Sequence, residues 1–177
     1  MTKSWKKITE EPFRAGFRKL LKKTFELPNG KIADFDIKQE GPAVCILALT
    51  KDQQVILAKQ FRPGPEKILL EMPGGLIEAN EKPQVAAQRE LLEETGYSGK
   101  LQFVGESLDC AYSTMIRYNF VATDCTKVQE QKLDDSEFAE IIKMPLEDFK
   151  KHLRSGQLTD VESGYMGLDY LKLSKNI

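Results

Sequence analysis

The chain of 177 residues contains few of the residues that mark several protein classes. It has three cysteines, without metal-ligand spacing, and a single histidine, His152, in a charged segment. We therefore expect reduced, partly buried thiols in a cytoplasmic protein, and acid–base chemistry performed by carboxylates instead of histidine. No apolar stretch approaches the roughly 18 residues of a membrane-spanning helix, and no signal-peptide pattern opens the chain.

An excess of one charge sign is also absent. The net charge is −1, although 30% of the residues are charged. This balance gives no electrostatic reason to expect a nucleic-acid or membrane partner. The length suits one domain, and no repeat or linker divides residues 1–177.

Acidic residues, in contrast, are concentrated in residues 75–97, GLIEANEKPQVAAQRELLEETGY. Glu90, Glu93 and Glu94 stand at i, i+3 and i+4 and share one face of a helix. Three carboxylates repel one another unless a cation lies between them, and Mg²⁺ prefers such oxygen ligands. The alternative interpretation is an exposed helix with ordinary ion pairs.

The ends and faces of this helix can be predicted. Asn80 is expected to cap it, Pro83 to lie in its first turn and Gly96 to end it in a left-handed conformation. One broad side is expected to pack on the core, with small residues on the opposite side leaving room for a metal and a phosphate. The core side comprises Val85, Gln88, Leu91 and Leu92, and the small residues are Ala86 and Ala87.

The spacing of these residues resembles the Nudix box, Gly-x5-Glu-x7-Arg-Glu-U-x-Glu-Glu-x-Gly-U, where U is bulky and apolar. The fixed positions are Gly75, Glu81, Arg89, Glu90, Glu93, Glu94 and Gly96. Tyr97 departs mildly from the usual aliphatic residue at the last position. This resemblance implies an enzyme with an α/β (α+β) fold, an α/β/α sandwich around a mixed β-sheet.

The segment QVILAKQFRPGPEKILLEMPGG is similar to the ADP-ribose and nucleotide-sugar pyrophosphatase branch of the Nudix superfamily. The likeness implies an extra N-terminal antiparallel strand region, residues 1–40, used for dimerisation and nucleobase binding, before a catalytic core, residues 41–177. It also implies a homodimer with exchanged N-terminal strands. The pattern of apolar residues predicts strands at 18–27, 31–39, 43–50, 54–61, 68–72, 101–108, 115–123 and 138–143. Two further helices are predicted at 145–155 and 161–173.

The resemblance implies how the box holds its metal. Glu90 and Glu94, joined by Glu93, are the expected ligands of Mg²⁺, with Mn²⁺ as a substitute, and the backbone carbonyl of Gly74 completes the site. We expect a sharp turn at Gly74 and Gly75 that brings the backbone close to the ion. Glu81 either orients Arg89 or a metal-bound water, or forms a plain salt bridge.

The general base is expected outside the metal ligands. In similar pyrophosphatases it is a glutamate on a loop before a late strand, which corresponds here to residues 129–140. Glu137 is the first candidate and Glu140 the second, with Glu93 of the box as a further one. The alternative is an ordinary polar loop.

Substrate contacts are predicted from single residues. Arg62, in Gln-Phe-Arg, suits a bidentate phosphate contact or is a solvent-exposed arginine. Glu71 is expected either to contact a sugar hydroxyl or to be structural. Trp5 could stack on a base or anchor its segment, together with Phe13 and Phe17.

One departure bears on the substrate. ADP-ribose hydrolases of this branch carry Ser-Pro-Gly and then a glutamate, whereas this chain has Asp109-Cys110-Ala111 and Met115 at the corresponding positions. The expected reaction is therefore hydrolysis of a nucleoside diphosphate sugar, with ADP-ribose, GDP-mannose and UDP- or ADP-hexoses all open. A catalytically silent sensor or assembly module is the alternative from another functional class.

Overall fold

The computed structural model describes residues 5–15, 18–133 and 138–173. The chain divides into two compact units. The first comprises Met1–Pro42 with Leu108–Ile116, and the second Ala43–Ser107 with Arg117–Ile177. The boundary after Pro42 lies close to the predicted limit at residue 40, but the contribution of residues 108–116 to the first unit has no counterpart in the prediction.

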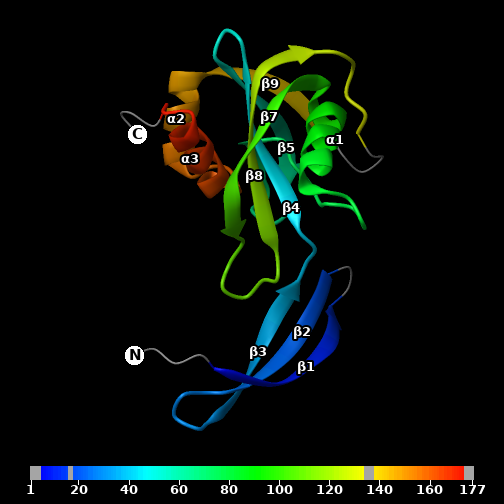
Figure 1. Cartoon of the computed structure of the whole chain (residues 1–177), viewed down its shortest axis with the longest axis vertical. Helices are drawn as coiled ribbons and strands as arrows, with labels where there is room; N and C mark the ends of the chain where they lie inside the picture. Colours follow the sequence, from blue (N-terminus) through cyan, green and yellow to red (C-terminus); the bar gives the residue numbers. More distant parts are fainter. Residues whose placement is uncertain (1–4, 16–17, 134–137, 174–177) are drawn as a thin grey trace. The chain divides into compact units, whose positions relative to one another are not determined.

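The first unit is built on an antiparallel sheet with the order β1-β2-β3 (Figure 1). These strands are β1 (Lys6–Ala15), β2 (Arg18–Glu26) and β3 (Ile32–Gln39). β1 was absent from the predicted strands, because its sequence KKITEEPFRA combines a charged run with Pro12 and lacks a clear apolar alternation.

Aromatic side chains gather on one face of this sheet. The ring of Trp5 lies 5.5 Å from that of Phe35 and 6.3 Å from that of Phe25, measured between centroids. Tyr112 stacks on Phe35 at 6.4 Å. The first unit therefore has a local aromatic cluster, which includes Trp5, a candidate for stacking on a nucleobase.

The second unit contains a mixed sheet with helices on both faces (Figure 1). The strand order is β6-β5-β4-β8-β7, β9 pairs with β5, and β4 runs parallel to β8. The strands are β4 (Ala43–Thr50), β5 (Gln54–Arg62), β6 (Lys67–Glu71), β7 (Tyr97–Leu108), β8 (Ile116–Lys127) and β9 (Ala139–Pro145). The helices are α1 (Pro83–Thr95), α2 (Leu146–Ser155) and α3 (Val161–Tyr170). The predicted α/β/α sandwich is confirmed.

β4 lies at the centre of this unit, and all eight of its residues are buried. Alternate side chains enter two core clusters, with Leu47 in the cluster that contains Phe149 and Leu168, and Ile46 in the cluster that contains Ala87. This explains why the strand reads as a continuous apolar run. Within the described residues, α1 with its 13 residues is the longest helix, and no helix has the length and apolarity needed to cross a bilayer.

The prediction for the faces of α1 was correct for Leu91, which is 1% exposed, but wrong for the two alanines and for Val85 and Gln88. Ala86 and Ala87 are fully buried in the core, whereas Val85 is 50% exposed and Gln88 is also exposed. The small residues allow the helix axis to approach the sheet closely, which large side chains at these positions would prevent. The alanines therefore bring the helix to the sheet and leave no space for a metal or phosphate beside them.

At the start of α1, Pro83 lies in the first turn as predicted, but the predicted cap, Asn80, was wrong. The N-cap is Lys82, with Pro83 at the first helical position, and no side chain caps the helix. Asn80 precedes it in a left-handed conformation with φ 66°, which asparagine tolerates better than most residues. The helix ends as predicted, because Gly96 adopts φ 75° and its N–H donates to the carbonyl of Leu92 at 2.8 Å.

Candidate functional site

The glycine pair before α1 lies in extended backbone beside β4. The N–H of Val44 donates to the carbonyl of Gly75, and the N–H of Ile46 to that of Pro73, both at 2.9 Å. The sharp turn predicted at Gly74 and Gly75 is thus absent. Space explains the glycines instead, because a Cβ on Gly74 would lie 2.2 Å from the carbonyl oxygen of Val44.

The same backbone contacts the acidic face of α1. The N–H of Gly74 donates to Oε2 of Glu94 at 2.8 Å, and a Cβ on Gly75 would lie 2.5 Å from a carboxylate oxygen of Glu90. In an extended chain the N–H and C=O of one residue point to the same side. The carbonyl of Gly74 therefore points toward the carboxylate of Glu94.

Arg89 connects the remaining acids of the segment. Its Nε and Nη2 donate to the two oxygens of Glu81, both at 3.0 Å, and its Nη1 donates to Glu90 at 2.8 Å and Glu93 at 3.3 Å. These bonds raise the pKa of Arg89, while the bond from Arg89 lowers the pKa of Glu81. Nη2 also donates to the carbonyl of Leu76 at 3.1 Å. This bond connects α1 to the glycine segment, residues 73–76, which contains Gly74 and Gly75.

The donor set fits a hard divalent cation. Glu90 and Glu94 offer carboxylate oxygens, the carbonyl of Gly74 faces the same place, and the missing Cβ of Gly75 keeps the approach to Glu90 open. Among the residues that the structure describes, no three acidic, histidine or cysteine side chains form a ligand cluster by themselves. A Mg²⁺ ion held here would therefore use backbone, water or substrate oxygens beside the two carboxylates.

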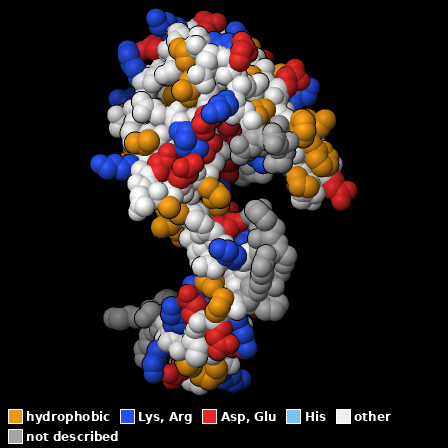
Figure 2. Space-filling model, turned by 90° about the vertical axis from the view of Figure 1, so that its right-hand side faces the viewer, with side chains coloured by type: hydrophobic (Ala, Val, Ile, Leu, Met, Phe, Trp, Pro, Cys, Tyr) orange, Lys and Arg blue, Asp and Glu red, His pale blue; other side chains and the backbone are white. Residues whose placement is uncertain are grey.

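Figure 2 faces the side of the second unit that α1 covers, and acidic and basic side chains lie next to one another there. Glu93 is the most exposed of the acids that bond to Arg89, at 38%, compared with 11% for Glu81 and 13% for Glu90. Arg89 is needed between Glu81 and Glu90, because carboxylates that are mostly buried destabilise the fold when no opposite charge is beside them.

The chain shares this segment with known proteins. The model of the NUDIX domain matches residues 39–160. The chain belongs to the Nudix family. The prediction of an enzyme of this family, similar to its ADP-ribose and nucleotide-sugar pyrophosphatase branch, is confirmed.

Two relatives cover most of the chain. The ADP-ribose pyrophosphatase of Bacillus subtilis (strain 168) is 35% identical over 153 residues, which are 85% of this chain and 82% of the relative. A methanol dehydrogenase activator of Bacillus methanolicus is 29% identical over 170 residues, 94% of this chain and 91% of the relative. A crystal structure of an ADP compounds hydrolase, 22% identical, has a TM-score of 0.81 and covers 100% of this chain and 99% of its own, which shows the shared fold.

The C-terminal end of the Nudix helix α1 is covered by the chain that follows β8. The carbonyl of Gly96 accepts from the N–H groups of Val128 and Gln129, and the carbonyl of Glu93 accepts from the N–H of Lys132. The side-chain amide of Gln131 donates to the carbonyl of Glu94 at 2.7 Å. A Cβ on Gly96 would lie 2.2 Å from the carbonyl of Gln129. Glycine is therefore needed at this position for two reasons, the positive φ and the lack of space for a side chain.

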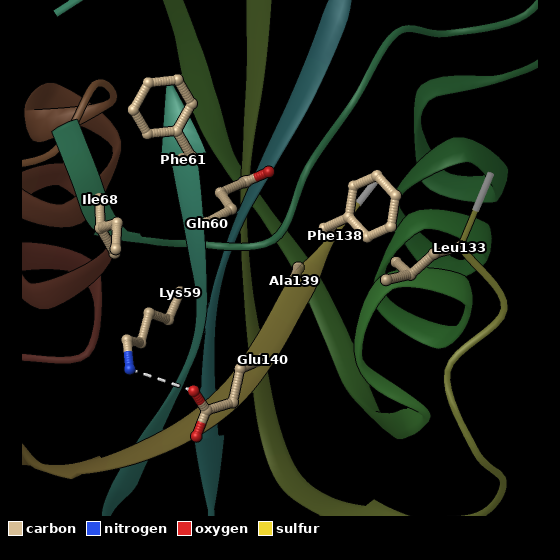
Figure 3. Close-up of a pocket in the computed structure, with 8 residues that line it drawn as sticks. All are labelled: Lys59, Gln60, Phe61, Ile68, Leu133, Phe138, Ala139 and Glu140. Atoms are coloured by element: carbon tan, nitrogen blue, oxygen red, sulfur yellow. Dashed lines mark hydrogen bonds and ion pairs between the residues drawn. The ribbon is translucent and has the colours of Figure 1, made fainter. Parts of the chain in front are cut away.

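A hollow of about 600 Å³ lies where β5, β6 and the start of β9 meet (Figure 3). Phe61 and Phe138 border it with 59% and 83% of their surface exposed. Glu140, the second candidate base, also lines it and accepts from Nζ of Lys59 at 3.1 Å. Glu137, the first candidate, lies outside the described residues.

Arg62 and Glu71, both predicted substrate contacts, bond to each other. Nε of Arg62 donates to Oε2 of Glu71 at 2.5 Å, and Oε1 of Glu71 accepts from the hydroxyl of Thr159, also at 2.5 Å. Glu71 is 1% exposed. Sequence reasoning missed Thr159, because it lies 88 residues from Glu71 and no local motif surrounds it.

The remaining predicted substrate contacts, Trp5 and Met115, belong to the first unit. Trp5 is 48% exposed within the aromatic cluster, and the N–H of Met115 donates to Oγ of Ser113 at 3.1 Å.

Of the cysteines, Cys45 and Cys125 are buried and Cys110 is exposed, and none forms a disulfide. Nε2 of His152 donates to the carbonyl of Leu70, 2.8 Å away, which gives the side chain a structural contact.

Proposed function

We propose that this Nudix protein hydrolyses the diphosphate bridge of a nucleoside diphosphate sugar in a Mg²⁺-dependent reaction that gives a nucleoside monophosphate and a sugar phosphate. ADP-ribose and other ADP-sugars are the first substrates to test. An ADP-ribose pyrophosphatase and an ADP-sugar pyrophosphatase are among the relatives. GDP-mannose stays an alternative, because a GDP-mannose pyrophosphatase is 26% identical over 150 residues.

The observation that carries this proposal is the contact between the glycine segment and α1. Gly74 donates to Glu94 and Gly75 lies against Glu90, so two carboxylates and a backbone carbonyl are gathered on one side of a fixed backbone. Bound Mg²⁺ supplies charge neutralisation of the diphosphate and lowers the pKa of a water molecule.

The protein's own residues divide the remaining work. We assign the ligand positions to Glu90, Glu94 and the carbonyl of Gly74, with Glu93 as a further acid at their exposed side. Arg89 holds Glu90 in place, and Glu81 in turn holds Arg89. Because both oxygens of Glu81 accept from Arg89, we favour the role in which Glu81 orients Arg89 over contact with a metal-bound water.

A carboxylate outside these ligands would remove the proton of the attacking water. We propose Glu137 or Glu140 for this role. Glu140 is 66% exposed, so its ion pair with Lys59 is open to solvent and easily broken. Single Glu-to-Gln replacements at both positions would separate the two candidates, and unchanged turnover in both would return the role to Glu93.

Nucleobase binding is proposed for the first unit. Its aromatic cluster contains Trp5 and Tyr112, whose exposed rings offer planar surfaces on which a base can stack. Met115, which follows Tyr112 closely, is proposed to contact the sugar. We further propose a homodimer in which the strands of this unit are exchanged, measurable as twice the mass of 20.1 kDa by light scattering.

The test is release of phosphate, coupled through a phosphatase, from ADP-ribose, ADP-glucose, UDP-glucose and GDP-mannose with and without Mg²⁺. Glu94→Gln is expected to reduce kcat by about 10³-fold, since a metal contributes several kcal/mol and each 1.4 kcal/mol is tenfold. The fold is expected to persist, because the amide oxygen of Gln can still accept from Gly74.

The control for this test is Glu147→Gln. Glu147 is also a helix glutamate, but its side chain is 72% exposed and pairs with Lys150 at 2.8 Å on α2, so no change in kcat is expected. If the wild-type protein releases nothing from any substrate yet binds nucleotide sugars, a silent sensor replaces the enzyme.

A further inference from the structure

The guanidinium of Arg62 is held at one edge by a buried acid. Its Nε donates to Oε2 of Glu71, whose side chain is 2% exposed while that of Arg62 is 42% exposed. The amide of Gln60 donates to the same oxygen at 3.3 Å. Among the described residues, no other hydrogen bond to the guanidinium is found, although its charge also acts on the buried Asp160. Because the side chain of Arg62 is 42% exposed, its terminal N–H groups can reach the surface.

The second oxygen of Glu71 is held from another part of the chain. The hydroxyl of Thr159 donates to Oε1 at 2.5 Å. Both oxygens of Glu71 thus accept hydrogen bonds, which fixes the rotation of the carboxylate about its last bond. An ionised carboxylate this deeply buried needs all of these donors.

Thr159 is itself fixed by the residues on either side. Leu158 is 6% exposed and belongs to the core cluster under α2 and α3. Oδ1 of Asp160 accepts from Nη2 of the buried Arg117 at 2.9 Å. The connection between the two helices is therefore anchored at both neighbours of the threonine, and its hydroxyl has little freedom to move away from Glu71.

We propose that Thr159 and Glu71 are positioning residues that orient the guanidinium of Arg62 toward the diphosphate of the substrate. A guanidinium held at Nε keeps its plane fixed and presents two parallel N–H groups, which match two phosphate oxygens. Glu71 also lies three residues before Gly74, so the acid that orients Arg62 leads directly into the proposed metal-binding backbone. This inference rests on the proposed function.

The experiment compares the KM for ADP-ribose with the affinity for inorganic pyrophosphate, measured by calorimetry in the presence of Mg²⁺. Thr159→Val preserves the shape of the side chain and removes its hydroxyl. It is expected to raise KM and weaken pyrophosphate binding by about fivefold to tenfold, with little change in kcat. This is less than the full value of a hydrogen bond to a charged group, because Thr159 acts on the substrate only through Glu71 and Arg62. Thr159→Ser retains the hydroxyl and is expected to stay within about twofold of the wild type on the same grounds.

A double-mutant cycle separates positioning from loss of structure. Arg62→Ala alone is expected to weaken pyrophosphate binding by about tenfold or more, and Thr159→Val is expected to have no further effect in that background. A merely structural threonine would weaken binding by the same factor with or without Arg62.

Thr50→Val is the matched control. The hydroxyl of Thr50 accepts from the N–H of Gln54 at 3.0 Å in the turn between β4 and β5. Its removal is expected to lower the melting temperature without changing KM or pyrophosphate affinity.

Three outcomes would overturn the inference: unchanged binding in Thr159→Val, failure of Thr159→Ser to retain binding, or additive effects with Arg62→Ala. Failure of the proposed function is a different result. It would be seen as no turnover by the wild-type protein, while the pyrophosphate titrations would still decide the role of Thr159.

Discussion

The helices on the two faces of the sheet in the second unit bury different side chains. α1 packs on the sheet through Ala86, Ala87 and Leu91, whereas α2 and α3 cover the opposite face and contribute Phe149 and Leu168 to its core. Small contacts bring the backbone of α1 close enough for its carboxylates to meet Gly75. Large contacts bury more apolar surface per residue. The two alanines therefore matter for the position of the α1 carboxylates, whereas Phe149 and Leu168 contribute to stability.

The largest expected effect lies on the face covered by α2 and α3. Phe149 is 0% exposed in the middle of its core cluster, and Phe149→Ala is expected to lower the free energy of unfolding by about 3–5 kcal/mol. Urea unfolding measures this change. The kcat of the folded fraction is expected to stay within about twofold, and a loss comparable to that of Glu94→Gln would contradict the separation of the two faces.

Phe138→Ala is the control for this substitution. Phe138 is 83% exposed, so its truncation removes little buried surface and is expected to change stability by less than about 0.5 kcal/mol.

A smaller effect on stability, with a larger effect on activity, is expected at the glycine segment. A Cβ on Gly75 would lie 2.5 Å from the carboxylate of Glu90, so Gly75→Ala displaces that side chain. We expect a loss of about 1–3 kcal/mol in stability from overpacking. We also expect kcat/KM to fall by about 10–100-fold, as when an interaction that orients a metal ligand is removed.

Gly64→Ala is the matched control, because no atom lies within 4 Å of a Cβ placed there. Equal activity losses in the two variants would show that the space beside Glu90 has no special role.

The smallest expected effect is on how the free energy of unfolding changes with pH, through the carboxyl groups of Glu81 and Asp160. The bond from Arg89 lowers the pKa of Glu81 below its ordinary 4.5, so its stabilising effect is present above that value and is lost as the pH falls through the folded-state pKa. Burial raises the pKa of Asp160 above its ordinary 3.8, so its contribution is fully present below 3.8 and is lost as the pH rises through the folded-state pKa.

Isosteric variants of the two residues test these opposite effects on the pH dependence of stability. Between about pH 5 and pH 3, Glu81→Gln is expected to reduce the acid-induced loss of stability, and Asp160→Asn to increase it, relative to wild type. Melting temperatures across this range measure both. The same direction of change in both variants would contradict the assignment.

Local sequence patterns predicted the elements whose burial is simple. β4 matched its predicted residues 43–50, since a strand buried on both faces reads as one apolar run. The acidic box predicted the carboxylates of α1, because fixed spacing along a helix is a local property. Leu91 was correctly placed on the buried face of α1, but Ala86 and Ala87 were not, since alanine is weakly apolar in a pattern yet lets a helix approach a sheet closely.

Contacts between distant parts of the chain could not be read from the sequence. Thr159 and Glu71 meet only after α2 and α3 fold onto the sheet, and neither belongs to a motif that specifies the other. Similarly, the glycine pair suggested a turn, whereas the need for glycine arises from the neighbouring β4 and Glu90. The identity of the base is left as a prediction for the same reason.

The chain that crosses the end of α1 also determines how this region opens. Helix carbonyls in a last turn usually face solvent and fray, but here Glu93, Glu94 and Gly96 accept from residues 128–132. The last turn and this segment must therefore separate together, as one cooperative unit in hydrogen exchange. A ligand that holds Glu94 would slow deuterium uptake at Lys132, although that amide lies on a different element of the fold.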